Sequence, residues 1–351
     1  MQDVRRNGSV IYSFKLALLL VVSLAGFSSP AIGVTPAGPA PANLPLAADE
    51  TVAVDATRYT AQNLDWTDTG RNRNVPARLY LPAVPHAPGS LPLVVFSHGI
   101  GGSRDGYSYL GRYLAANGYA SLHVQHVGSD RQVWFGNPFS MVSRLSDAAQ
   151  ESEALNRVQD VRFALDRILE PGASTLIDAR RVVVAGHSYG ANTAMLVAGA
   201  RVDPQGRSVS LKDPRVSAAI LISAPPFYGL GDPKRILSGI DIPTLHITAT
   251  ADDIQIPGYF SGLPDRLEIF KAMGSDSSAP KVLAVFREGS HSMFTDRMGT
   301  GGSALNPRVK IATRQLALAF LERLQSGSFV ALQRWPTTHA DIVATFERRA
   351  L

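Results

Sequence analysis

The stretch Val182-Val183-Val184-Ala185-Gly186-His187-Ser188-Tyr189-Gly190 decides the fold of this chain. Its β-branched residues are typical of a buried strand in a parallel sheet. The small apolar residues 191–198 that follow predict a helix packed against that sheet. A Gly-x-Ser-x-Gly turn between a strand and a helix holds its serine in a strained backbone conformation, and its glycines avoid clashes with neighbouring segments. The pattern therefore predicts that Ser188 is a nucleophile.

Strands and helices alternate along the rest of the chain, which indicates a mostly parallel sheet covered by helices on both faces. The expected strands cover residues 59–66, 75–82, 93–96, 120–124, 218–223, 244–248 and 281–286. The expected helices cover residues 107–117 and 152–169, with a last helix over residues 308–324. Prolines at both borders of 75–82 predict that this strand lies at an edge of the sheet.

The N-terminal segment has the composition of a secretory signal peptide. Arg5, Arg6 and Lys15 precede an apolar run over residues 16–27, which is shorter than the ~20 residues of a membrane-spanning helix. We therefore predict a signal peptide (1–33), an Ala/Pro-rich linker (34–50) and a single catalytic domain (51–351). This organisation predicts export to the periplasm or the extracellular space, without a stable membrane anchor.

Composition excludes several classes of function. The chain has no cysteine, so disulfides, zinc–thiolate sites and a thiol nucleophile are ruled out. The net charge is +5; removing residues 1–33 takes away three basic residues and one acidic residue, which leaves +3. Without a block of basic residues in the domain, no nucleic-acid partner is expected. Histidines and carboxylates lack metal-ligand spacing, so we expect no metal and no cofactor. The oligomeric state stays open.

A serine hydroxyl needs a base that is oriented by an acid. Of the eight histidines, His291 alone lies in a loop directly after the last strong strand and follows Ser188 in the chain. His246 falls inside a predicted strand, where a core histidine is the better interpretation, and His339 is placed in the terminal tail. His187 is expected to point away from Ser188. We predict that His291 is the general base.

Two adjacent aspartates compete for the role of the acid. Both follow the strand predicted over residues 244–248. Counting from the end of that strand, with Ala249 in a glycine position, favours Asp252, whereas counting back from Pro257 favours Asp253. Because adjacent side chains diverge, only one of them can face His291. We choose Asp252 and keep Asp253 as the alternative.

Two backbone N–H groups must meet the negative oxygen that forms when serine attacks a carbonyl. One is expected from Tyr189, the residue after the nucleophile. The other is expected from Ile100 in the glycine-rich loop Ser97-His98-Gly99-Ile100-Gly101-Gly102, which follows an earlier strand.

These motifs together carry a family resemblance. His98-Gly99-Ile100-Gly101-Gly102, Gly186-His187-Ser188-Tyr189-Gly190 and Gly289-Ser290-His291 resemble the α/β-hydrolases, as do residues 68–82 and 126–130. Within this superfamily, the chain most resembles the branch of platelet-activating-factor acetylhydrolase-like and dienelactone-hydrolase-like proteins, to which chlorophyllases and polyester hydrolases are related. The resemblance covers about residues 59–324. It implies an α/β-hydrolase fold with the nucleophile elbow after the central strand. Dienelactone hydrolases proper use a cysteine, which this chain lacks.

The segment 129–146 is a long excursion between a strand and a helix, placed where ligands bind in this topology. We expect Trp134, Phe227 and Tyr259 to line an apolar substrate site. The predicted function is a serine esterase that cleaves small-molecule carboxylic esters with short or small hydrophobic groups. The alternatives are a lipase or polyester hydrolase acting on long-chain or polymeric esters, and a non-catalytic ligand-binding protein on a hydrolase scaffold.

Overall fold

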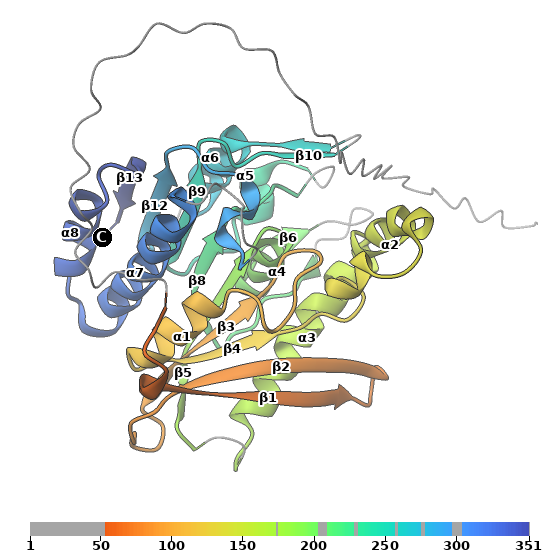
Figure 1. Cartoon of the computed structure of the whole chain (residues 1–351), viewed down its shortest axis with the longest axis horizontal. Helices are drawn as coiled ribbons and strands as arrows, with labels where there is room; N and C mark the ends of the chain where they lie inside the picture. Colours follow the sequence, from red (N-terminus) through yellow and green to blue (C-terminus); the bar gives the residue numbers. More distant parts are fainter. Residues whose placement is uncertain are drawn as a thin grey trace, which may run out of the picture.

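The computed structural model describes residues 53–350 except 173–174, 203–208, 228–230, 257–258, 275–277 and 297–303. The predicted signal peptide and linker lie outside these residues. The described chain forms a twisted sheet with helices on both faces (Figure 1). The mostly parallel α/β architecture predicted from the sequence is confirmed.

The sheet has nine strands in the order β1-β2-β4-β3-β5-β8-β9-β12-β13. Strands from β4 to β12 run parallel, whereas β1, β2 and β13 pair antiparallel with their neighbours. The strands are β1 (Tyr59–Asp68), β2 (Arg73–Pro82), β3 (Leu91–Ser97), β4 (Ala120–Val124), β5 (Ile177–His187), β8 (Val216–Ile222), β9 (Thr244–Ala249), β12 (Lys281–Phe286) and β13 (Val343–Arg349). In Figure 1, β1 and β13 mark the two ends of the sheet.

The central strands are apolar at almost every position because both faces of the sheet are covered. In β3, Leu93 and Val95 join one buried cluster, whereas Val94 and Phe96 join the other. The same alternation runs along β5. One cluster contains residues of α3, α4, α5 and α6, and the other contains residues of α1, α7 and α8.

The helices that cover the sheet are α1 (Ser108–Ala116), α3 (Glu151–Leu169), α4 (Tyr189–Ala198), α5 (Pro233–Leu237), α6 (Leu263–Ala272), α7 (Leu305–Ser326) and α8 (Val330–Thr338). An excursion between β4 and α3 contains η2 (Arg131–Trp134), η3 (Pro138–Ser140) and α2 (Met141–Ala148). The remaining elements are η1 (Ala56–Arg58), η5 (His291–Phe294) and two short hairpins, β6 (Arg201–Val202) with β7 (Val209–Ser210), and β10 (Ile254–Ile256) with β11 (Tyr259–Ser261).

The prediction that residues 75–82 form an edge strand is wrong. β2 lies between β1 and β4, and β1 is the edge. Both prolines are nevertheless accommodated, because β4 pairs only with Ala77 through Tyr80. Pro76 and Pro82 lie outside that stretch, so neither leaves a gap in the ladder with β4.

The prediction that the helix over residues 308–324 is the last element is also wrong. α7 is followed by α8 and by β13, which pairs antiparallel with β12. His339 is therefore not in a loose tail: it caps the end of α8 and is buried. Trp335 anchors this extension, since its indole N–H donates to the Ala312 carbonyl at 2.8 Å and its ring packs on Phe286 and Phe346.

We expect Trp335→Ala to lower the free energy of unfolding by about 3–5 kcal/mol, because it leaves a cavity between α7, α8 and β12. Trp335 is 3% exposed, whereas Val330 on the same helix is 53% exposed. The matched control Val330→Ala should change stability by less than about 0.5 kcal/mol. Urea unfolding measures both. A Trp335→Ala variant as stable as Val330→Ala would show that α8 and β13 add little to the folded core.

Candidate active site

Ser188 lies at the sharp turn between β5 and α4, with backbone angles φ 56° and ψ −124°. This is a sparsely populated conformation for a residue with a side chain. The two glycines of the turn are required by close approach: a Cβ on Gly186 would lie 2.1 Å from the Gly190 carbonyl oxygen, and a Cβ on Gly190 would lie 1.9 Å from the Ser97 carbonyl oxygen. The turn holds Ser188 partly exposed at the carboxyl end of β5.

His291 lies at the start of η5, directly after β12, and reaches Ser188 from there. Its Nε2 lies 2.8 Å from the Ser188 Oγ. His187 holds the backbone of His291 in place: the His187 Nε2–H donates to the His291 carbonyl at 3.0 Å. The other ring nitrogen of His187, Nδ1, lies 2.7 Å from the Tyr107 hydroxyl. His187 thus does not face Ser188, in line with the sequence prediction, but it anchors the backbone of the residue that does.

Asp252 completes a hydrogen-bonded chain with these two residues. Its Oδ1 accepts from His291 Nδ1–H at 2.7 Å, and its Oδ2 accepts from the Thr248 hydroxyl at 2.7 Å. Asp252 is fully buried, whereas Asp253 is exposed. Of the two aspartates that the sequence left in competition, the structure brings Asp252 to His291.

The charge of Asp252 is stabilised by a buried arginine. The Arg266 Nε, carried by α6, lies 3.6 Å from the Asp252 Oδ2, and Arg266 is itself 3% exposed. Burial raises the pKa of Asp252, but the hydrogen bond with His291 and the charge of Arg266 outweigh it and hold that pKa well below its usual range. Asp252 is therefore a carboxylate at neutral pH. Sequence reasoning missed Arg266 because α6 itself carried no recognised pattern.

The glycine-rich loop after β3 lies beside Ser188. A Cβ on Gly99 would lie 3.2 Å from the Ser188 Cβ. Residues 99–102 form a tight turn in which the Gly102 N–H donates to the Gly99 carbonyl at 3.1 Å, and Gly101 takes a positive φ of 74°.

The side chain of His98 sets the orientation of the next peptide. Its Nε2 accepts from the backbone N–H of His126 at 3.1 Å, so its proton is on Nδ1, which donates to the Gly99 carbonyl at 2.7 Å. In a trans peptide the C=O and the following N–H point in opposite directions. The Ile100 N–H therefore points away from the His98 ring and from Gly102.

The two N–H groups predicted as donors are open in this arrangement. The N–H of Ile100 donates to no carbonyl among the residues that the structure describes. Tyr189 is the first residue of α4, where a backbone N–H has no partner within the helix. Both residues are partly exposed, as are Ser188 and His291.

Trp134 packs directly on this loop. Its indole N–H donates to the Gly101 carbonyl at 2.9 Å, and its ring joins a small apolar cluster with Ile100, Val133 and Leu145. The other two predicted substrate contacts are not brought to this cluster. Phe227 packs against the large core cluster that contains residues of α3 and α4. The side chain of Tyr259 lies outside the described part of the chain.

Five histidines around the sheet are buried and neutral. Burial lowers the pKa of His123 to about 4, and it lowers those of His126, His187 and His246 to about 3. Burial also holds the pKa of His98 well below its usual range. His246 is the core histidine expected from its place in β9, with its Nε2 3.1 Å from the Thr244 hydroxyl.

The fold and the serine turn together define an α/β hydrolase. The family profile described as "Alpha/beta hydrolase family" matches residues 94–344, and the chain belongs to this family. The match begins in β3 and ends in β13, beyond the limit at residue 324 that the sequence resemblance suggested.

A solved ferulic acid esterase from Streptomyces cinnamoneus is similar in structure, with a TM-score of 0.54 and 24% sequence identity. The likeness covers 78% of this chain and 92% of that chain, and at this identity it concerns the fold alone. No curated protein matches the sequence.

No described helix is long and apolar enough to cross a membrane. Within the same residues, no group of three or more histidine, aspartate or glutamate side chains is arranged to hold a metal ion.

The buried histidines make the fold sensitive to acid. An unfolded histidine takes up a proton below about pH 6.5, whereas the four histidines whose pKa values are about 4 or about 3 stay neutral until about pH 4, so falling pH favours the unfolded chain. Each should remove about 1.4 kcal/mol of stability per pH unit between roughly pH 6 and 4. Urea unfolding at pH 7.5, 6.0 and 5.0 measures this loss. His246→Phe should reduce the pH dependence of the free energy of unfolding by the contribution of one histidine. A free energy of unfolding that is independent of pH over this range would contradict the assignment of these histidines as buried and neutral.

Proposed function

We propose that this protein is a serine esterase that hydrolyses carboxylic esters through an acyl-enzyme on Ser188. One observation carries the proposal: the chain of hydrogen bonds from the Ser188 hydroxyl through His291 to Asp252, with distances of 2.8 and 2.7 Å. Both distances suit proton transfer by a positioned base that an acid orients.

In the first half of the reaction, the Ser188 Oγ attacks the ester carbonyl carbon while its proton passes to His291 Nε2. The ionised Asp252 stabilises the imidazolium that forms. The carbonyl oxygen becomes an oxyanion, which accepts hydrogen bonds from the N–H groups of Ile100 and Tyr189. The carbon–oxygen bond to the alcohol then breaks, and His291 Nε2–H protonates the leaving alcohol.

In the second half, water attacks the acyl-enzyme carbonyl and gives a proton to His291 Nε2. A second oxyanion forms in the same place and collapses with cleavage of the bond to the Ser188 Oγ, which recovers its proton from His291. The products are the carboxylic acid and the free enzyme, and no cofactor enters the balance.

We propose small esters with short or hydrophobic groups as the substrates, in keeping with the acetylhydrolase-like resemblance of the sequence. The packing of Trp134 and Ile100 on one small apolar cluster supports this choice, because Trp134 then lies against the loop that carries the proposed oxyanion donor. The similarity to a ferulic acid esterase adds aromatic acyl esters as a group to test. Export through the N-terminal signal peptide is part of the same proposal.

A second candidate is a lipase or polyester hydrolase. It is favoured by two phenylalanines on the excursion between β4 and α3: Phe135 is 62% exposed and Phe139 is 94% exposed. Exposed aromatic residues of this kind suit contact with a long-chain or polymeric ester surface.

The experiment that tests the proposal is hydrolysis of p-nitrophenyl esters from acetate to palmitate, together with methyl ferulate, by the purified mature chain. We expect the highest kcat/KM with short acyl groups. Ser188→Ala should lower kcat by about 10⁴-fold or more while the thermal unfolding midpoint stays the same.

The outcomes separate the candidate functions. Highest activity on palmitate would favour the lipase or polyester hydrolase. A folded protein without activity on any ester would refute the serine esterase and favour the ligand-binding alternative. Activity that survives Ser188→Ala would refute the role of Ser188 as the nucleophile.

The two aspartates supply a matched pair for the role of the acid. Asp252→Asn should lower kcat by about 10⁴-fold, because an amide in this position cannot hold His291 in the required tautomer or stabilise its charge. Asp253→Asn should stay within about 3-fold of the wild type, since Asp253 is exposed and Asp252 makes the contact to His291. Equally mild effects of the two substitutions would mean that the acid lies elsewhere.

A further inference from the structure

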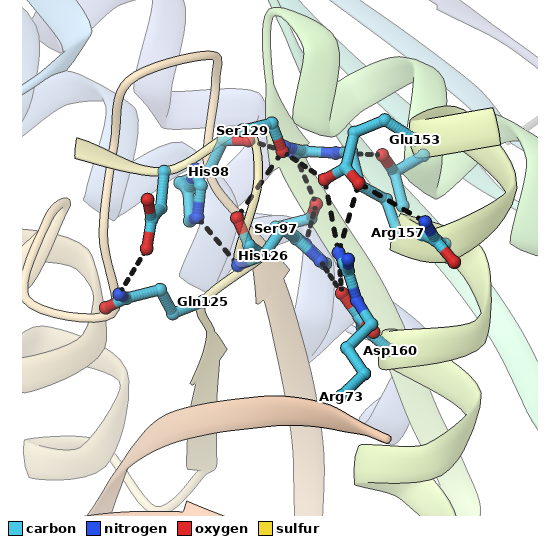
Figure 2. Close-up of polar contacts among 12 residues, drawn as sticks. Arg73, Ser97, His98, Gln125, His126, Ser129, Glu153, Arg157 and Asp160 are labelled. Carbon is cyan, nitrogen blue, oxygen red and sulfur yellow. Dashed lines mark hydrogen bonds and ion pairs between the residues drawn. The ribbon is translucent and has the colours of Figure 1, made fainter. Parts of the chain in front are cut away.

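Arg157 is a fully buried cation directly behind the proposed oxyanion hole. It comes from α3 and is the largest fully buried side chain among the described residues. Its guanidinium donates to four groups: Thr193 Oγ1 at 3.0 Å, Ser129 Oγ at 2.8 Å, Ser97 Oγ at 3.1 Å and the His98 carbonyl oxygen. All four are neutral acceptors. Figure 2 shows most of this arrangement.

Three of the four partners of Arg157 belong to the two segments that carry the proposed oxyanion donors, and Ser129 lies outside them. The His98 carbonyl lies in the loop that presents Ile100. On the other side, Thr193 lies on α4, and the Tyr189 ring lies 4.5 Å from the guanidinium carbon. The Thr193 hydroxyl in turn donates to the Tyr189 carbonyl at 3.1 Å. One planar guanidinium therefore links the loop after β3 to the first turn of α4.

Two carboxylates are linked to Arg157 only through other groups: Glu153 through one side chain and Asp160 through two. Ser129 donates its hydroxyl to Glu153 at 2.7 Å. On the other branch, Ser97 Oγ lies 2.9 Å from His126 Nε2, and His126 Nδ1 lies 3.1 Å from Asp160. Because neutral His126 donates from Nδ1 to the carboxylate, its Nε2 accepts from the Ser97 hydroxyl.

The two carboxylates are themselves neutralised by other arginines. Arg73 donates to both Glu153 and Asp160, and Arg71 donates to Asp160 at 2.9 Å. Burial lowers the pKa of Arg157 to about 10, so it is still a cation at neutral pH. The positive charge of Arg157 thus lies next to the loop and α4, and no carboxylate of the described segments contacts it directly.

We propose that Arg157 is a positioning residue of the oxyanion hole, which holds the Ile100 and Tyr189 donor segments in register and adds a buried positive potential behind them. This inference rests on the proposed esterase function. The oxyanion exists only in the tetrahedral states, so an interaction that serves it acts on kcat and leaves ground-state binding almost unchanged.

The test compares Arg157→Met with Arg71→Met. Both remove an arginine of the same buried network, but Arg71 contacts neither the loop nor α4. We expect Arg157→Met to lower kcat by about 10–100-fold with KM within about 3-fold, as a small misplacement of reacting groups does. Arg71→Met should leave both constants within about 3-fold. Equal effects of the two variants on kcat would overturn the inference.

A second readout distinguishes positioning from general loosening of the fold. Phenylboronic acid forms a tetrahedral adduct with an active serine and places an oxygen where the oxyanion develops. Its inhibition constant should rise in Arg157→Met by the same factor by which kcat/KM falls. An unchanged inhibition constant would overturn the inference. Arg157→Lys, which keeps the charge but cannot bridge both segments, should stay at least about 10-fold below the wild type; full activity of this variant would also overturn it.

If the Arg157 variants fail to fold, Thr193→Val tests the proposed positioning role of Arg157 instead. This nearly isosteric change removes one acceptor of the guanidinium on α4. It should lower kcat and weaken phenylboronic acid by the same factor, about 3–10-fold, and wild-type values for both would overturn the inference. Labelling of the wild type by a fluorophosphonate keeps the two proposals separate. No labelling of Ser188 would refute the esterase itself, whereas a labelled wild type with fully active variants would refute only the role of Arg157.

Discussion

The backbone contact between Gly190 and the Ser97 carbonyl is the constraint on which the site depends. The space there excludes even a methyl group, since a Cβ on Gly190 would lie 1.9 Å from that oxygen. The contact presses the start of α4 against the end of β3, and it therefore brings Ser188 beside Gly99. The proposed nucleophile and the loop that carries the proposed donor Ile100 are far apart in the chain, and this single close approach makes them neighbours.

Behind that contact lies a buried polar layer at the carboxyl end of the sheet. Buried polar groups are costly unless they are hydrogen-bonded, and buried charges need compensation. The layer meets both conditions because its hydrogen bonds form a chain in which each group donates to the next. Arg157 donates to Ser97, whose hydroxyl turns toward neutral His126, and His126 donates to Asp160. Each proton in this chain has one acceptor, which gives the loop after β3 one preferred arrangement.

The other half of the site is built from the ends of three parallel strands. Ser188 follows β5, Asp252 follows β9 and His291 follows β12. Because parallel strands end at the same edge of a sheet, side chains far apart in sequence converge there. Arg266 and Thr248 then fix the carboxylate of Asp252, and His187 fixes the backbone of His291. Asp252 and His291 are thus held in place by groups that do not themselves take part in the proposed proton transfer.

Much of the fold and of the candidate site could be predicted from local sequence patterns. The glycines around Ser188 and the apolar strands predicted the elbow and the parallel sheet, because backbone strain and burial on both faces restrict the allowed residues. The order of the motifs along the chain predicted His291 as the base, and it left Asp252 and Asp253 as the two candidates for the acid. Counting from the end of the strand favoured Asp252, but only the tertiary structure showed which of the two aspartates contacts His291, since this depends on which side chain of an adjacent pair turns inward. The same is true of the interior position of β2, the addition of α8 and β13, and the burial of Arg157 and Arg266. These features arise from contacts between segments distant in the chain, and a sequence pattern records the periodicity of one segment but not the partner it meets.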